Sequence, residues 1–171
     1  MKKFELTSEF ITNIFGTKLF RIKALIEFGN VKAGELGGFV EKEENLNHEG
    51  NAWVYGNAEV YGNARVYGNA SVYGNASVYG NASVYGNARV CGDARVYGNA
   101  DYATVHGFGS EYRTTTFFKT KAGEIGVRCG CFYGNLSEFR KKVVETHGET
   151  KKAKEYLMLA DLMEFRFSDN S

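Results

Sequence analysis

Residues 50–97 read GNAWVY GNAEVY GNARVY GNASVY GNASVY GNASVY GNARVC GDARVY, which is one six-residue word repeated eight times. A ninth copy at residues 98–103 starts in the same way and then loses the pattern. Repetition at a fixed short period is typical of folds in which one structural unit stacks on the next. The centre of the chain is therefore predicted to be a solenoid, an architecture that does not by itself specify a function.

The chemistry of one word predicts the shape of the coil. Valine and alanine are the apolar residues that can share an interior, while tyrosine and the variable residue flank the valine and point away from it. Gly-Asn suits the corner, because both residues tolerate positive φ. Strands that alternate with corners predict a mainly β fold, a parallel β-helix in which three words make one triangular coil of about 18 residues.

Stacked coils place residues 18 apart above one another, so the outward tyrosines form columns. One interpretation is that these columns only stiffen the coils. The other is that one column is an interface of a homo-oligomer, because exposed aromatic surface and tyrosine are typical of interfaces. We expect a small symmetric assembly, a dimer or a trimer. The predicted interface residues are Tyr61, Tyr79, Tyr97, Tyr55 and Tyr73.

Solenoids expose open edges at both ends, and the flanking segments are predicted to cap them. Apolar runs at residues 10–15 and 19–26 predict an N-terminal β-hairpin. Residues 31–49 keep a degraded word and predict an irregular first coil. In it Leu36 with Val40, and Lys42 with Leu46, hold the valine and alanine places, and His48 closes the end. The predicted domains are a cap at 1–49, the solenoid at 50–101 and a small α+β domain at 102–171.

The C-terminal domain has the composition of a small α+β unit. Residues 104–109, 113–120 and 126–133 predict three short strands. Asn135, with glutamate three residues on, predicts the start of a helix that Gly148 ends. A second helix is expected over residues 151–163, followed by a strand at 164–167.

One segment of this domain has the composition of an anion site. Hydroxyls, glycine backbone and one guanidinium come together between residues 106 and 118, and such groups bind phosphate or carboxylate. The alternative is a hairpin turn with a threonine row that faces solvent. The candidate ligand-binding residues are His106, Ser110, Arg113, Thr114 and Thr115.

Cys129 and Cys131 allow two interpretations. With His106 or His147 they could supply ligands of a zinc site. Their spacing places both on one face of a strand without a second matching pair, so structural, buried cysteines are the preferred interpretation and no metal is expected.

Composition limits the classes of function. The 171 residues carry 21 basic and 20 acidic side chains, for a net charge of +1. No segment has the basic excess that drives binding to duplex nucleic acid. The N-terminus lacks the apolar run of a signal peptide, and no stretch reaches the roughly 18 apolar residues of a membrane span. We therefore expect a cytoplasmic protein with no membrane partner.

Two resemblances follow from these motifs. Residues 50–101 resemble the left-handed solenoid of the hexapeptide-repeat acyltransferases. The strings at 34–40 (GELGGFV), 108–117 (FGS, then RTTTF) and 129–132 (CGCF) are similar to a group of uncharacterised phage and prophage proteins. The first resemblance implies a left-handed coil and a general-base histidine, yet no histidine lies between His48 and His106 and no insertion interrupts the words.

The hypothesis that the sequence favours is a non-catalytic binding protein, without a cofactor, in which a rigid oligomeric rod presents a C-terminal recognition surface. The phage resemblance implies an inhibitor of host defence, which would block a host protein or sequester a small anionic, nucleotide-like ligand in the host cytoplasm. The alternatives are an acyltransferase-like enzyme and a structural virion or spacer component.

Overall fold

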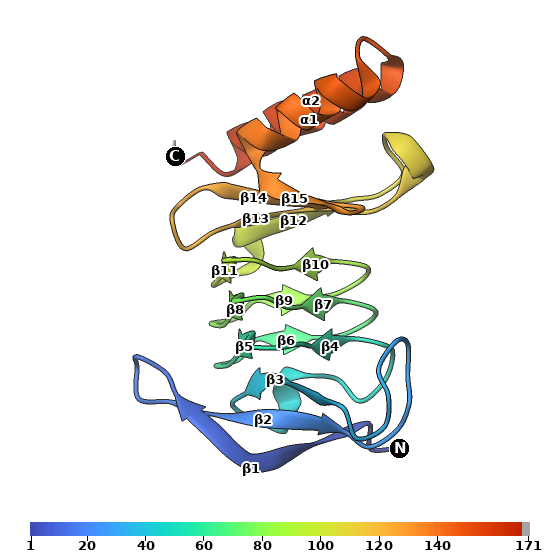
Figure 1. Cartoon of the computed structure of the whole chain (residues 1–171). Helices are drawn as coiled ribbons and strands as arrows, with labels where there is room; N and C mark the ends of the chain where they lie inside the picture. Colours follow the sequence, from blue (N-terminus) through green and yellow to red (C-terminus); the bar gives the residue numbers. More distant parts are fainter. Residues whose placement is uncertain (169–171) are drawn as a thin grey trace.

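The computed structural model describes residues 1–168, and these form a single stack (Figure 1). A β-hairpin lies at the base, the repeated words form coils above it, and a small sheet with two helices lies at the top. The fold is mainly β, with its helices confined to the C-terminal end.

The repeated words form eight two-residue strands on three faces. Strands 18 residues apart pair in parallel, so that Val54 pairs with Val72 and Val72 with Val90. This confirms the triangular coil of three words; its left-handed sense stays a prediction. The strands are β4 (Trp53–Val54), β5 (Glu59–Val60), β6 (Arg65–Val66), β7 (Ser71–Val72), β8 (Ser77–Val78), β9 (Ser83–Val84), β10 (Arg89–Val90) and β11 (Arg95–Val96).

Valine and alanine fill the inside of the coils, as predicted. Every valine and alanine of the eight words is buried, and together they form one continuous core with the base of the molecule. Backbone hydrogen bonds join the coils: the amide of Tyr61, for example, donates to the carbonyl of Val78 at 3.0 Å. Interior packing and backbone pairing thus repeat at every step of the stack.

Three antiparallel strands build the base: β1 (Phe4–Thr12), β2 (Lys18–Ala24) and β3 (Leu36–Val40). The predicted N-terminal hairpin is confirmed by the pairing of β1 with β2. β3 then pairs in parallel with β5, so hairpin and coils share one six-stranded sheet in the order β1-β2-β3-β5-β8-β11.

The first coil differs from the prediction. Val40 pairs with Val60 and Leu46 bridges to Val66, so Val40 and Leu46 both occupy valine places, whereas Leu36 is exposed. The reason is length: Leu46 and Val54 are eight residues apart, where repeated valines are six apart. The longer corner contains His48, which stacks on Phe4 with ring centroids 4.4 Å apart instead of entering the coil.

The C-terminal sheet has four strands where three were predicted: β12 (Tyr102–Val105), β13 (Thr115–Lys119), β14 (Ile125–Cys129) and β15 (Phe132–Asn135). Helices α1 (Leu136–His147) and α2 (Lys151–Arg166) cover its outer face. The Asn135 cap is confirmed, because its carboxamide oxygen accepts from the amide of Glu138 at 2.8 Å. The strand predicted at 164–167 is wrong: α2 continues to Arg166, which brings Met163 and Phe167 into the same core.

Strand β13 joins this sheet to the solenoid, because its side chains alternate between two cores. Phe117 faces the helices, and Phe118 packs into the core of the coils. On the same side as Phe118, the hydroxyl of Thr116 accepts from the amide of Arg89 at 3.0 Å. The sheet therefore caps the upper end of the stack, and solenoids need such a cap because their last coil has unpaired strand edges.

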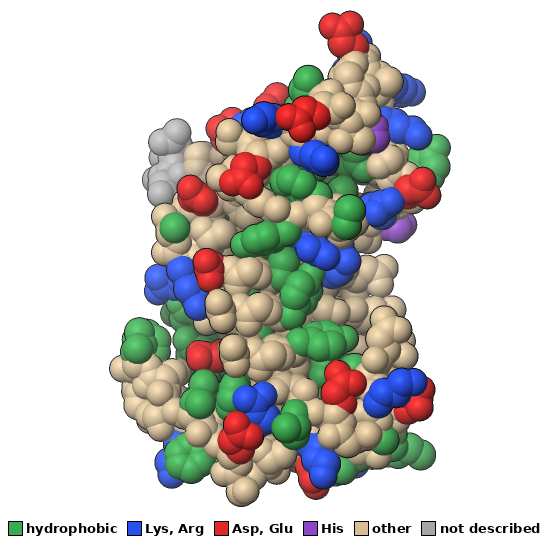
Figure 2. All heavy atoms as spheres, in the orientation of Figure 1, with side chains coloured by type: hydrophobic (Ala, Val, Ile, Leu, Met, Phe, Trp, Pro, Cys, Tyr) green, Lys and Arg blue, Asp and Glu red, His purple; other side chains and the backbone are tan. Residues whose placement is uncertain are grey.

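The surface carries both signs of charge. Figure 2 shows basic and acidic side chains interspersed over the face in view, in line with a net charge of +1. Among residues 1–168, neither helix has the length and apolar character needed to cross a membrane.

Candidate functional site

The tyrosine columns exist as expected. Tyr61 and Tyr79 stack with ring centroids 4.9 Å apart, and Tyr97 lies 5.2 Å beyond Tyr79. Tyr55 and Tyr73 form a second column at 6.4 Å. Burial raises the pKa of Tyr61 and of Tyr73 to about 12, so these hydroxyls stay protonated at neutral pH.

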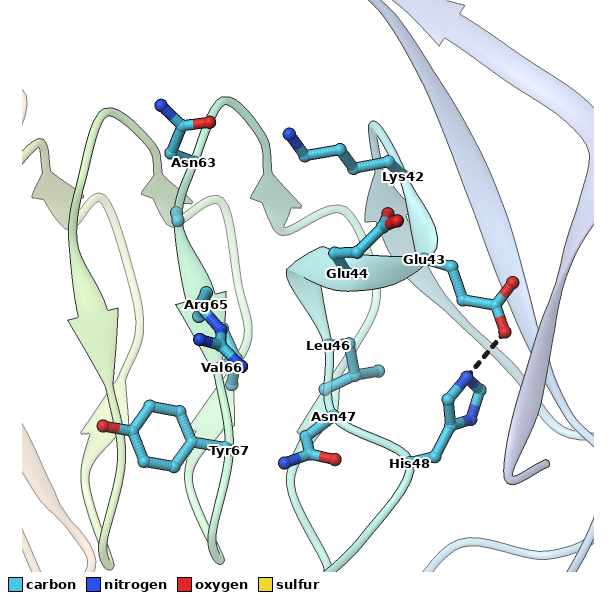
Figure 3. Close-up of a pocket in the computed structure, with 11 residues that line it drawn as sticks. Lys42, Glu43, Glu44, Leu46, Asn47, His48, Asn63, Arg65, Val66 and Tyr67 are labelled. Atoms are coloured by element: carbon cyan, nitrogen blue, oxygen red, sulfur yellow. Dashed lines mark hydrogen bonds and ion pairs between the residues drawn. The ribbon is translucent and has the colours of Figure 1, made fainter. Parts of the chain in front are cut away.

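A large hollow of about 670 Å³ lies beside the lowest coils (Figure 3). Its charged groups are of both signs, with Lys42 and Arg65 near Glu43 and Glu44. The ring of His48 is already engaged: Nδ1 accepts from the amide of Lys3, so Nε2 carries the hydrogen and donates to Glu43 at 2.6 Å. That hydrogen bond lowers the pKa of Glu43. These contacts join Lys3, His48 and Glu43 at the base of the molecule.

A smaller cavity of about 200 Å³ lies between the C-terminal sheet and α1, and we call it the C-terminal pocket. It brings together two residues of the predicted anion segment, both cysteines of the CGC string and one face of the helix pair. It is lined by Ser110, Arg113, Cys129, Cys131, Phe132, Phe139, Lys142, Val143, Thr146, His147 and Tyr156.

Tyr156 of α2 positions the serine of the pocket. The amide of Ser110 donates to the Tyr156 hydroxyl at 2.8 Å, and the two hydroxyls lie 3.1 Å apart. Gly109 makes this approach possible, because a Cβ at that position would collide with the Tyr156 ring. Burial raises the pKa of Tyr156, which therefore remains a neutral hydrogen-bonding group. The loop before β13 is thus tied to α2 across 46 residues of sequence.

The two cysteines differ, which corrects the prediction that both lie buried on one face of a strand. Cys129 ends β14, and its sulfur accepts from the hydroxyl of Thr115 at 3.3 Å. Cys131 lies in the tight turn before β15 and is exposed. The chain turns at Gly130, where φ is +58°, so the two-residue alternation of a strand ends before Cys131.

Arg113 lies against this turn. A Cβ at Gly130 would overlap the Arg113 guanidinium, so glycine is needed for the arginine to take this place. The Gly130 carbonyl is occupied by the guanidinium of Arg89, which reaches up from the solenoid. Within residues 1–168 the buried Nε of Arg113 has no hydrogen-bond partner. An unpaired buried donor is costly unless a ligand or water satisfies it.

The lining of the pocket is electropositive. Arg113, Lys142 and His147 surround it, and among residues 1–168 no Asp or Glu lines it. Phe132 and Phe139 form apolar walls, which strengthen electrostatic attraction by keeping water out. Hydroxyl, guanidinium and ammonium groups around a small apolar-walled space are suited to a phosphate or a carboxylate.

The structure divides the predicted anion segment. Ser110 and Arg113 line the pocket, and Thr115 lies behind Cys129. His106 and Thr114 do not line it; they pair with each other, Nδ1 to Oγ1, at 3.0 Å.

Of the helical half of the pocket, sequence reasoning named only His147, as a candidate zinc ligand with Cys129 and Cys131, and it missed Lys142, Thr146 and Tyr156. Lys142, Thr146 and His147 border the apolar face of α1, and Tyr156 lies on α2. For the missed residues, the sequence offered only the amphipathic pattern of the helices. That pattern does not show which strands the helices cover.

No metal cluster accompanies this pocket in the described part of the chain. In residues 1–168, no three or more His, Cys, Asp or Glu side chains lie close enough together to hold a metal ion. Cys129, Cys131 and His147 share the pocket without forming such a group.

Comparison with known proteins supports the solenoid. The family described as YdcK beta solenoid repeat matches residues 58–74 and 88–100, which lie inside the stacked coils. A search among curated proteins gave no match. The chain is therefore a β-solenoid repeat protein, and the match does not extend to the C-terminal pocket.

Proposed function

We propose that the chain is a non-catalytic binding protein whose C-terminal pocket takes the anionic group of a small ligand. The observation that carries this proposal is the lining of about 200 Å³: Arg113, Lys142, His147 and a serine hydroxyl, with no Asp or Glu among the residues that the structure describes. That volume is below the range of about 300–1,000 Å³ typical of sites for drug-sized ligands. The pocket is therefore suited to one phosphate or carboxylate, with the rest of the ligand outside.

The rigid stack supports a role in presentation. The pocket lies at the far end of the coils from the N-terminal hairpin, on a sheet that shares its core with the solenoid. Hydrogen bonds hold Ser110 against Tyr156, and Arg113 packs against Gly130, before any ligand arrives. Preorganised groups bind with a smaller entropic cost. The biological setting that we propose, on the resemblance to phage proteins, is sequestration of a nucleotide-like signal of host defence in the host cytoplasm.

Binding can be tested by calorimetry with inorganic phosphate, a nucleoside monophosphate and acetate as probes. Arg113→Ala and Lys142→Ala are each expected to weaken binding at least about tenfold, because a hydrogen bond to a charged group contributes about 1.5–3 kcal/mol. Lys141→Ala is the matched control: it removes the same charge from the adjacent position of α1, which does not line the pocket. Unchanged binding in both pocket variants, with circular dichroism intact, would remove this site.

A further inference from the structure

The tip of the β1–β2 hairpin is an exposed apolar knob. Ile14 is 94% exposed and Phe15 is 66% exposed. The tip, residues 13–17, reads Asn-Ile-Phe-Gly-Thr and carries no charge. In Figure 1 it projects to one side of β5, and at the same place in Figure 2 the surface is hydrophobic.

The knob is rigid. The side-chain oxygen of Asn13 accepts from the amides of Phe15 and Thr17 at 2.9 and 3.0 Å. Backbone bonds between residues 13 and 16 and between 13 and 17 close the same turn. A preformed knob loses little conformational freedom when it binds, so its apolar side chains contribute more fully to affinity.

Beside the knob, the first tyrosine column lines a concave surface that we call the ladder groove. Two adjoining cavities of about 510 and 500 Å³ make it up, and they share Phe15, Tyr79, Arg95 and Lys121. The hairpin tip forms one wall, and the turn between β13 and β14 forms another. The groove has the aromatic content of an interface core.

The charges of the groove suit a second copy of the chain. Both signs are present, with Glu59 and Asp101 near Arg95 and Lys121. Among the described residues, Glu59 makes no ion pair; burial raises the pKa of its carboxyl group, and the nearby charge of Lys121 offsets this rise only in part. The ammonium of Lys18, which follows the knob directly, lies over the ring of Phe10 at 4.7 Å and makes no ion pair in residues 1–168. A knob that enters the groove brings this lysine toward Glu59, which makes no ion pair in the described part of its own chain and has only the more distant Lys121 as a neighbouring cation.

We infer that two copies form a symmetric dimer in which the hairpin tip of each packs into the ladder groove of the other. The symmetry follows from placement: knob and groove lie side by side on one face of the same chain. A two-fold axis midway between them carries each knob onto the other copy's groove, and such an isologous contact closes at two subunits. In this arrangement Ile14 and Phe15 leave water, which is the main source of stability for such an interface.

The assembly state tests this inference directly. Light scattering on the protein at tens of micromolar is expected to give about twice the chain mass of 19.0 kDa. Replacing Ile14 and Phe15 together by Asp is expected to give monomers with unchanged circular dichroism, because both side chains are exposed in the single chain. Phe165→Asp is the matched control, since that side chain is 78% exposed on α2 and should leave the dimer intact. A monomeric wild type, or a dimeric tip variant, would overturn the inference.

Cross-linking tests the exchange of knobs. Cys131→Ser first removes the exposed thiol. Chains with Ile14→Cys are then mixed with chains carrying Tyr97→Cys and treated with a short bis-maleimide. The expected product is a cross-linked heterodimer, and the Phe165→Cys chain in place of Ile14→Cys should give none. Equal cross-linking from both positions would contradict knob exchange. The assembly readout is independent of ligand binding at Arg113, so either proposal can fail alone.

Discussion

At the scale of single residues, Lys3 is the least expected feature of the molecule. Its side chain is buried between the hairpin and the first repeated coil. The ammonium donates to the carbonyls of Ala52 at 2.8 Å and Gly50 at 3.3 Å, and it lies 4.7 Å from the ring centre of Phe28. These contacts replace water only in part, because burial lowers the pKa of Lys3 from 10.5 to about 8. The charged form of Lys3 therefore lowers the stability of the folded protein at neutral pH.

The sign of the pH dependence follows from this shift. Between pH 8 and 10.5 the unfolded chain holds the Lys3 proton and the folded chain has released it, so this residue makes stability rise with pH. Urea unfolding measures the free energy of unfolding of wild type and of Lys3→Met at pH 7 and at pH 10. From pH 7 to pH 10, this free energy should rise more in wild type than in Lys3→Met. Tyr61, Tyr73 and Tyr102, whose pKa burial raises to about 12, act in the opposite direction above pH 10 but are common to both proteins. A difference that is constant with pH would refute the assignment.

At the scale of the element, the corner glycines do two separate things. All eight words begin with a glycine at positive φ, where other L residues are strained. Some of these glycines also stack directly on the next coil. A Cβ at Gly74 (φ +68°) would lie 2.8 Å from the amide nitrogen of Gly92, whereas a Cβ at Gly86 (φ +65°) would meet nothing within 4 Å.

This pair separates backbone strain from stacking. Gly86→Ala is expected to destabilise by about 1–2 kcal/mol, the cost of left-handed backbone. Gly74→Ala should cost about 1–3 kcal/mol more, because its methyl group forces two coils apart. Chemical denaturation of the two variants measures the difference directly. If both variants lost the same free energy of unfolding, the coils would be able to move apart at Gly74 at little cost.

At the scale of the whole molecule, we expect the stack to unfold as one cooperative unit. The solenoid core runs from Phe4 at the base to Phe118 of the C-terminal sheet. Trp53, the single tryptophan, is buried near the base with Phe28 5.3 Å away and so reports on that end. The helices, at the other end, dominate the circular dichroism at 222 nm. Neighbouring coils stabilise one another, so we expect unfolding at one end to destabilise the other.

The two probes test this coupling. In the wild type, the unfolding transitions followed by Trp53 fluorescence and by circular dichroism at 222 nm should have the same midpoint concentration of denaturant. Phe118→Ala should lower the free energy of unfolding by about 3–5 kcal/mol, because it opens a cavity where the sheet and the solenoid meet. Both probes should then show a lower midpoint concentration of denaturant. Phe108→Ala, at a partly exposed loop position, is the control and should have little effect. If Phe118→Ala left the midpoint of the Trp53 fluorescence transition unchanged, the base and the C-terminal sheet would unfold separately.

Local sequence determined the coils, their 18-residue stacking, the tyrosine columns and the Asn135 cap. Each of these depends on residues within one word or one helical turn, and the words repeat the same information eight times. The errors came outside the regular words: at the longer corner around His48, at the turn that exposes Cys131, and at the end of α2. In each case one or two residues changed the register, and local propensity does not record that change.

Only the tertiary structure decided what surrounds each candidate residue. It brought Arg113 beside Lys142 and His147, buried Lys3 under the first repeated coil and placed the hairpin tip next to the ladder groove. Contacts between residues more than 25 positions apart produce all three arrangements. Such contacts depend on how whole elements pack, and no periodic pattern in the sequence encodes them.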